Sequence, residues 1–290
     1  MLRQKARRLL RLPLEMRALW RDRNMSGELR HEVAICAIFR EEAPFLADWI
    51  AFHRHVGVSK FFLYNNFSTD HFRDVLEPLV KDGSVILHDW PVEVGQLPAY
   101  RHCVKHHWRD ARWIAFIDID EFLFPADGGS LIDYLRTRQE LPGVHVWQAF
   151  FGSAGHEKRP NLPVPLAYTM RAPLWQTTIK TIANPRQIYK PGVHDMKFWT
   201  GKSRDNSGRE FQRGQPPVLD GLRINHYWSR SIEDLRQKVA RGDASTAARR
   251  DLAWHLDFER TLNAEKDQSI LRLANEAFSA YSAEAGLVST

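Results

Sequence analysis

The sequence predicts an α/β fold in which a mostly parallel sheet is flanked by helices. Between residues 31 and 117, short apolar runs of strand length alternate with segments of helical periodicity. The apolar runs are continuous, which is typical of parallel strands buried on both faces. Strands that alternate with helices in this way form parallel sheets with covering helices. In such sheets, ligands bind beyond the carboxyl ends of the strands.

The first half of the chain carries clear signals for seven elements. Acidic residues and Pro44 mark the start of the first helix, because proline is favoured in a first helical turn. In chain order, we expect a strand at 33–39, a helix from Pro44 to Gly57, a strand at 60–64, a helix from a cap at Ser68 to Lys81, a strand at 85–87, a helix at 98–109 and a strand at 113–117.

The second half is less regular, since residues 152–220 hold many of the prolines and glycines. Within that stretch, 205–217 has the composition of an exposed, mobile loop. Ser231 to Asp234 form a candidate capping box at a helix start. The expected elements are a helix at 131–139, a strand at 143–151, a final strand at 222–228, a helix from about Ser231 and a polar-faced helical region over 249–280.

Composition bounds the class of protein. The chain has 290 residues, 43% of them hydrophobic, enough for one large or two small domains. It has no apolar run near the ~20 residues of a membrane-spanning helix. Its two cysteines, Cys36 and Cys103, argue against a disulfide framework and for a reducing compartment. The net charge of +6 suits an anionic partner, but no recognition motif for nucleic acid accompanies it.

Positive charge is concentrated at the N-terminus, where residues 1–23 carry eight Lys or Arg and two acidic residues, interleaved with leucines. Such a segment could lie on an anionic membrane surface. It could equally be a solvated helix packed on the domain, and Pro13 weakens the membrane interpretation. We therefore expect a cytoplasmic protein, with a peripheral position on the inner membrane face as one option. The expected division is a basic segment at 1–30, a main domain at 31–245 and a helical extension at 246–290.

Three carboxylates within the very apolar segment 113–125 are the most informative feature. Asp118, Asp120 and Glu121 follow the predicted strand, and the chain then becomes apolar again. A buried, unpaired carboxylate is costly, whereas divalent cations take carboxylate oxygens as ligands. Asp118 and Asp120 would face the same side of an extended backbone, so they could share one Mg²⁺ or Mn²⁺. The alternative is that these residues cap a helix or pair with arginine.

Polar clusters follow three of the predicted parallel strands. They are Phe39-Arg40, Asn65-Asn66 and Asp118 to Glu121. Because ligands bind beyond the carboxyl ends of parallel strands, we expect the three clusters to converge on one rim of the sheet and to form a ligand site there.

Five blocks of residues, in order, resemble glycosyltransferase family 92 and related bacterial family 2-like glycosyltransferases. The resemblance covers roughly residues 31–245. The blocks are Arg40-Glu41-Glu42 with Leu46 and Trp49, Tyr64 to Asp70, Trp113 to Phe122, Phe151 to His156, and Ile224 to Tyr227 followed by Lys238 and Arg241 to Asp243. The long segment around 200–217 departs from the family pattern, so the acceptor site cannot be inferred from it.

This resemblance implies a GT-A fold, a nucleotide-sugar donor with a UDP-sugar favoured, and a Mn²⁺ ion, or Mg²⁺, on the donor diphosphate. It further implies transfer with inversion to a glycan or lipid-linked acceptor. The metal candidates are Asp118 and Asp120, completed by His226 or, second, His194. A general base is needed near the acceptor hydroxyl, and Asp195 is preferred over Glu121 and Glu157.

The candidate donor-binding residues lie along the rim and in the distal half of the chain. Asn65 and Asn66 could equally form a plain turn, and a surface lysine is usually only solvated. The candidates are Phe39, Arg40, Glu42, Asn65, Asn66, Asp70, Gln96, Arg101, Lys180, Lys238 and Arg241. A sugar-stacking residue could be among Trp147, Trp175, Trp199 and Trp228, although tryptophan is more often a core residue.

Two other functions stay open at this point. A haloacid-dehalogenase-like phosphatase also uses Asp-x-Asp with Mg²⁺, but on its first strand, whereas here the motif follows the fourth. A non-catalytic protein that binds nucleotides or a membrane surface would suit the basic charge.

Overall fold

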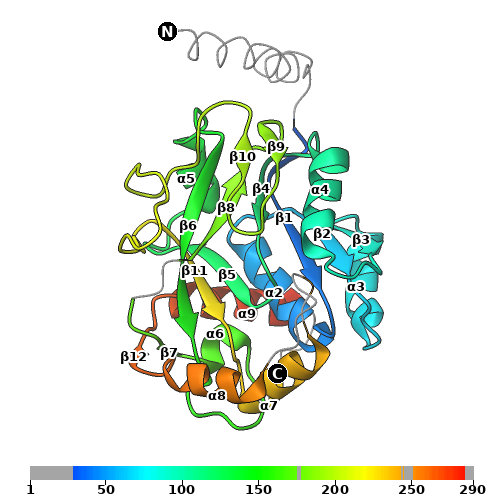
Figure 1. The fold of residues 1–290 in the computed structure, drawn as a ribbon. Coiled ribbons are helices and arrows are strands. Elements are labelled where there is room, and N and C mark those ends of the chain that lie inside the picture. The colour runs from blue at the N-terminus through cyan, green and yellow to red at the C-terminus, as the bar shows by residue number, and fades with distance from the viewer. Residues whose placement is uncertain (1–28, 175–177, 243, 245–250, 285–290) are drawn as a thin grey trace.

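The computed structural model describes residues 29–174, 178–242, 244 and 251–284. It confirms the expected α/β class, with a largely parallel central sheet between helices (Figure 1). The elements in chain order are β1 (His31–Phe39), α2 (Ala43–His55), β2 (Lys60–Asn65), α3 (Phe72–Lys81), β3 (Val85–Asp89), α4 (Gln96–His107), β4 (Ala111–Phe116), β5 (Glu121–Pro125), α5 (Leu131–Arg136), β6 (Gly143–Phe151), α6 (Val164–Ala167), β7 (Met170–Arg171), β8 (Ile179–Ala183), β9 (Ile188–Lys190), β10 (Lys197–Phe198), β11 (Leu222–Tyr227), α7 (Ile232–Arg241), α8 (Leu252–Arg260), β12 (Glu265–Lys266) and α9 (Leu271–Glu284).

The sheet has a parallel half and a mixed half. β3, β2, β1 and β4 are neighbours in that order and all run parallel. β8 is antiparallel to both β4 and β6, so β6 runs in the same direction as β4. β11 is parallel to β6 and antiparallel to β5. The carboxyl ends of β1, β4 and β11 therefore point toward the same edge of the sheet.

Successive residues of β1 pack into two different hydrophobic cores, as the alternation of side chains along a strand requires. Val33, Ile35 and Ala37 join the core beneath α2, α3 and α9. Ala34 and Cys36 join the core beneath α4. This explains why the strand is continuously apolar, and α2 and α9 lie behind the sheet in Figure 1. The C-terminal helix α9 thus belongs to the same core as β1.

Several local predictions are confirmed. Each of the four predicted strands up to residue 117 is present within two residues of its expected bounds. Ser231 and Asp234 form the expected capping box at α7. Cys36 and Cys103 are both buried and form no disulfide. Residues 249–280 hold α8 and most of α9, although the short strand β12 separates them.

Other local predictions are wrong. Ser68 does not cap α3, which begins at Phe72 with His71 in the cap position; its hydroxyl accepts a hydrogen bond from Glu41 N instead. The helix expected at 131–139 ends at Arg136. The loop expected at 205–217 is exposed or half-buried from residue 206 onward, but Asp205 itself is buried, and its carboxylate accepts hydrogen bonds from Ser207 and Arg209.

The basic segment at 1–28 lies outside the described residues, so its membrane or packed role stays a prediction. Among the helices that the structure does describe, none has the length and apolar character to cross a membrane.

Candidate active site

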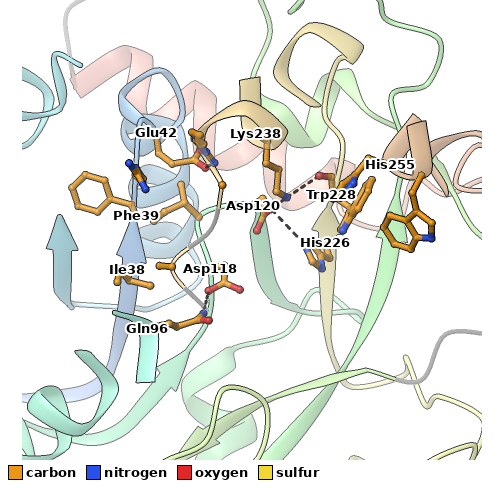
Figure 2. Close-up of a pocket in the computed structure, with 16 residues that line it drawn as sticks. Ile38, Phe39, Glu42, Gln96, Asp118, Asp120, His226, Trp228, Lys238 and His255 are labelled. Carbon is orange, nitrogen blue, oxygen red and sulfur yellow. Dashed lines mark hydrogen bonds and ion pairs between the residues drawn. The ribbon is translucent and has the colours of Figure 1, made fainter. Parts of the chain in front are cut away.

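A cavity of about 420 Å³ opens where the carboxyl ends of β1, β4 and β11 meet. Figure 2 shows Ile38, Phe39 and Gln96 on one side, acidic residues in the middle, and Trp228 and His255 on the other side. The lining residues are Ile38, Phe39, Arg40, Glu42, Gln96, Asp118, Ile119, Asp120, His226, Trp228, Lys238, Arg241, Gly242, Ala244, Trp254 and His255. The predicted convergence of the first and third rim clusters is thus observed.

The acidic residues occupy the connection between β4 and β5. Asp118 and Asp120 do not lie on an extended strand as expected, because β4 ends at Phe116 and the backbone turns, with Glu121 N donating to Asp118 O at 3.1 Å. The chain then returns as β5, which pairs with β11 so that Glu121 lies opposite His226. The turn and this register bring the three carboxylates and the imidazole together.

Asp120 and His226 line the cavity, and the fully buried Glu121 lies directly beneath them. We call these three residues the floor of the cavity. Each of the three offers one ligand atom, and these atoms lie within 4.8 Å of one another. His226 Nε2 is 3.4 Å from Asp120 Oδ2, and its Nδ1 is 3.7 Å from Glu121 Oε1. Within the described part of the chain, His226 Nδ1 is buried and has no hydrogen-bond partner. Two carboxylates and an imidazole with an unused nitrogen suit a cation such as Mn²⁺.

The pKa values of the two floor carboxylates are shifted in opposite directions, that of Asp120 by neighbouring charges and that of Glu121 by burial. Burial of Asp120 would raise its pKa, but the Lys238 ammonium and His226 hold that pKa well below its usual value. Burial raises the pKa of Glu121 to about 8, against the influence of Lys180. Glu121 is fully buried, accepting hydrogen bonds from Gln148 Nε2 and, at 3.0 Å, from the backbone N of Asp118.

Asp118 lines the cavity beside this floor but is held by other partners. Its Oδ1 accepts from Gln96 Nε2 at 2.8 Å and its Oδ2 from Lys180 Nζ at 2.6 Å. A carboxylate has about four acceptor positions, so these two bonds leave capacity for a ligand. Lys180 itself is buried and is also 3.6 Å from Glu121, which places its charge behind the cavity wall.

Helix α7 brings cations to the cavity. Lys238 Nζ binds Asp120 Oδ2 at 2.5 Å and the carbonyl of Trp228 at 2.9 Å. Arg241 donates to Glu42 and to Glu41 O, and Arg230 NH1 binds Glu42 Oε2 at 2.6 Å. Burial would raise the pKa of Glu42, but the two guanidiniums outweigh it and lower that pKa. Glu42 therefore fixes α7 against the end of β1.

Three predicted donor ligands form turns beside the cavity rather than lining it. Asn65 donates to Asp89 and accepts from Ser68 N, whereas Asn66 donates to the carbonyls of Trp90 and Val92. Asp70 accepts from Ala43 N at the start of α2. The turn alternative considered for the two asparagines describes their observed contacts.

Other predicted residues lie outside the cavity lining. Arg101 lines a separate hollow with Trp108 and Tyr189. Asp195 lies 3.3 Å from Lys197 Nζ and 3.4 Å from Ser203 Oγ, and His194 directs its Nδ1 to Ile179 O at 3.1 Å.

Glu157 is exposed on the loop after β6 and likewise does not line the cavity. Of the two distal histidines proposed as metal ligands, His226 lies within ligand distance of the acidic cluster, whereas His194 does not belong to that group.

Sequence reasoning missed Trp254 and His255, which line the cavity from α8, and Arg230, which holds Glu42. The helical periodicity of 249–280 carried no sign that α8 would return to the rim. Arg230 has a positive φ of 53° directly before the capping box, a turn that no local motif announced.

The model of glycosyltransferase family 92 matches residues 30–232. The chain belongs to glycosyltransferase family 92. A family 92 protein from Ricinus communis is 30% identical over 75% of this chain and 39% of its own length. Another, from Oryza sativa subsp. japonica, is 32% identical over 72% of this chain and 35% of its own length.

A more distant relative carries a more specific name. Galactan beta-1,4-galactosyltransferase from Arabidopsis thaliana is 24% identical over 62% of this chain and 41% of its own length. The chain thus spans about two fifths of the length of these relatives. Among solved structures, S. aureus TarS 1-349 matches 53% of this chain with a TM-score of 0.37 at 10% identity, a likeness too distant to support an argument.

Proposed function

We propose that this family 92 protein is a metal-dependent glycosyltransferase that moves a sugar from a nucleotide-diphosphate donor to a glycan or lipid-linked acceptor, with inversion at the anomeric carbon. The observation that carries the proposal is the cluster of Asp120, Glu121 and His226 within 4.8 Å, at the floor of a cavity that cationic residues of α7 border.

Asp120 and His226 line the cavity and would hold a Mn²⁺ or Mg²⁺ ion together with Glu121, while Asp118 would contact it directly or through water. The ion, when bound, would act as a Lewis acid on the departing diphosphate. The imidazole in the donor set favours Mn²⁺, because Mg²⁺ prefers an all-oxygen environment.

The remaining charges of the cavity suit the rest of a diphosphate. Lys238, Arg241 and Arg40 line it together, so three cations border the acidic floor. Ammonium and guanidinium groups bind phosphate oxygens through charge-assisted hydrogen bonds. Once a phosphate is bound, Lys238 would be shared between it and Asp120, which keeps the buried charges balanced.

The general base stays a prediction. Asp195, the preferred residue, pairs with Lys197 outside the cavity lining, and Glu121 lies buried in the floor. If Asp195 is the base, Asp195→Asn abolishes the acid limb of the pH profile of transfer. A variant with near-wild-type transfer and an unchanged profile would remove the assignment.

The donor test uses a panel of nucleotide sugars with and without Mn²⁺. The name of the Arabidopsis relative makes UDP-galactose the first donor to try. A ligand that binds only the folded state raises the melting temperature, so we expect a UDP-sugar with Mn²⁺ to raise Tm, and the ion to be needed for sugar release. Hydrolysis of simple phosphate esters without any sugar transfer would support a phosphatase instead.

A position on the inner membrane face is a separate proposal that rests on the composition of residues 1–23 alone. Flotation with phosphatidylglycerol vesicles, lost in a variant with those eight basic residues neutralised, would support it. Failure of the wild type to float would contradict it.

A further inference from the structure

One wall of the cavity is aromatic and is built from α8 and from Trp228, the residue that follows β11. We call the set Trp228, Trp254, His255 and Phe258 the aromatic wall; the first three line the cavity. His255 stacks on Trp228 with ring centroids 5.2 Å apart and planes 15° apart. Trp254 stacks on Phe258 at 5.3 Å and 5°. Trp254 is nevertheless 56% exposed, a large apolar surface to leave in water at the mouth of a charged cavity.

The aromatic wall is held rigidly, although it stands at the surface. Glu259 Oε1 accepts from Ser153 N at 3.0 Å, and Asn263 Oδ1 accepts from Ala154 N at 2.8 Å, which fastens α8 and the turn after it to the loop following β6. A Cβ on Gly152 would come within 2.5 Å of Asn263, so only glycine permits this approach. Phe258 packs with Trp228 in a small separate core. The rings are thus oriented before any ligand arrives.

The aromatic wall and the end of β1 lie on opposite sides of the cavity floor. Ile38, Phe39 and Gln96 stand at the ends of β1 and α4, the usual ligand edge of a parallel sheet. Trp228 and His255 stand across Asp118 and Asp120 from them (Figure 2). A donor whose diphosphate lies on the floor and whose nucleoside lies by β1 therefore presents its sugar toward the aromatic wall. The group that receives this sugar must approach from that side.

We propose that the aromatic wall binds a pyranose ring of the acceptor glycan, with Trp254 as its main contact. This inference rests on the proposed function. A pyranose presents a face of C–H bonds that packs on an aromatic ring, while its hydroxyls need polar partners at the ring edge. Aromatic surface beside charged and polar side chains is the lining expected of such a site. A lipid tail, by contrast, would gain nothing from the charged groups next to it.

The aromatic wall also lies largely outside the part of the chain that defines the family. The family model matches 30–232, whereas Trp254, His255 and Phe258 belong to α8. The floor lies inside the match. We therefore infer that the floor, inside the match, carries the metal chemistry and that α8, outside it, contributes to acceptor selection.

The test compares the wild type, Trp254→Ala, Trp254→Phe and Leu252→Ala. Leu252 is the matched control, because it is an exposed apolar residue of the same helix that does not line the cavity. Each protein is applied to a panel of immobilised oligosaccharides, and its Tm is measured separately with UDP and Mn²⁺. We expect Trp254→Ala to reduce glycan retention at least tenfold, Trp254→Phe to restore most of it, and Leu252→Ala to behave as the wild type. All four keep the same Tm shift with UDP and Mn²⁺.

Three results would overturn the inference. The first is a wild type that retains no glycan, and the second is glycan retention that Trp254→Ala leaves unchanged. The third is a Tm shift with UDP that Trp254→Ala abolishes, because it would mean that the donor base stacks on the aromatic wall. Failure of the proposed function looks different. A wild type that retains glycans through Trp254 but releases sugar from no nucleotide sugar would contradict the donor chemistry and still support the aromatic wall as a glycan site.

Discussion

The floor of the cavity and its aromatic wall are built in contrasting ways. The floor is charged, deeply set and formed by β5, β11 and the turn before β5, with Glu121 placed opposite His226 by strand register. The aromatic wall is apolar, partly exposed and formed by a helix that returns from later in the chain. Groups that act on a diphosphate need fixed charges in a low-dielectric setting, whereas a surface that selects an acceptor can differ between proteins that share the same floor.

The largest effect should come from the floor. Asp120→Asn removes a charge that we assign to the metal, and we expect sugar release from the donor to fall about 1,000-fold, since loss of even an outer-shell partner of a metal costs 10–100-fold. Turnover of the donor with Mn²⁺ measures this. Asp257→Asn, an exposed carboxylate of α8, is the control and should change turnover less than twofold. A loss below tenfold for Asp120→Asn would mean that the floor does not carry the chemistry.

The ion pairs that hold α7 to β1 should come next. Glu42→Gln leaves the buried Arg230 and the half-buried Arg241 without their shared carboxylate. Removing one partner of a buried pair costs about 3–5 kcal/mol, so we expect the free energy of unfolding in urea to fall by about 3 kcal/mol. Glu77→Gln breaks only an exposed pair with Lys81 and should cost less than about 0.5 kcal/mol. Equal losses would show that Glu42 does not anchor the helix.

A buried histidine beneath the floor should make stability depend on pH. His53 Nδ1 donates to Trp49 O and its Nε2 accepts from Leu123 N in β5, and burial lowers its pKa to about 3. The unfolded chain takes up a proton near pH 6.5 while the folded protein does not, so this stability is present above the unfolded pKa and is lost as the pH falls from there toward 3.

Between pH 7 and pH 5, His53 should account for about 2 kcal/mol of lost unfolding free energy. Urea titrations at the two pH values, with His53→Gln as the comparison, isolate this contribution. The wild type should lose about 2 kcal/mol more than the variant over this interval, and parallel losses in both would contradict the assignment.

The smallest effect should come from the aromatic wall. We expect Trp254→Ala to raise the KM for the glycan acceptor about tenfold and to leave the KM for the donor within twofold, because a stacked ring contributes on the order of 1 kcal/mol. Steady-state kinetics with each substrate varied in turn separate the two constants. A larger change in the donor KM than in the acceptor KM would remove the contrast between floor and wall.

The same contrast explains what the sequence could predict. The sequence predicts the strands at 33–39 and 60–64 and the acidic cluster at Asp118 to Glu121, because their signals lie in consecutive residues and continuous apolar runs. The sequence also favours His226, because it lies on the last predicted strand, and the pairing of that strand brings it to the cluster.

Features that depend on the path of the chain in space could not be predicted. Asp118 to Asp120 form a turn instead of an extended segment. The chain turns there so that β5 can pair with β11, about a hundred residues later, and a local motif does not reveal such a long-range contact. The return of Trp254 to the rim depends on Glu259 and Asn263 meeting a loop about a hundred residues earlier. A short polar motif also does not decide between the two roles considered for Asn65 and Asn66, ligand binding and turn formation.

The most direct test of the central claim is Mn²⁺ uptake, followed by the loss of the electron paramagnetic resonance signal of the aqueous ion. The wild type should bind one Mn²⁺ per chain more tightly in the presence of UDP, and His226→Ala should weaken that binding more than about tenfold, as should Asp120→Asn. Equal uptake by the wild type and both variants would contradict the metal site on the cavity floor.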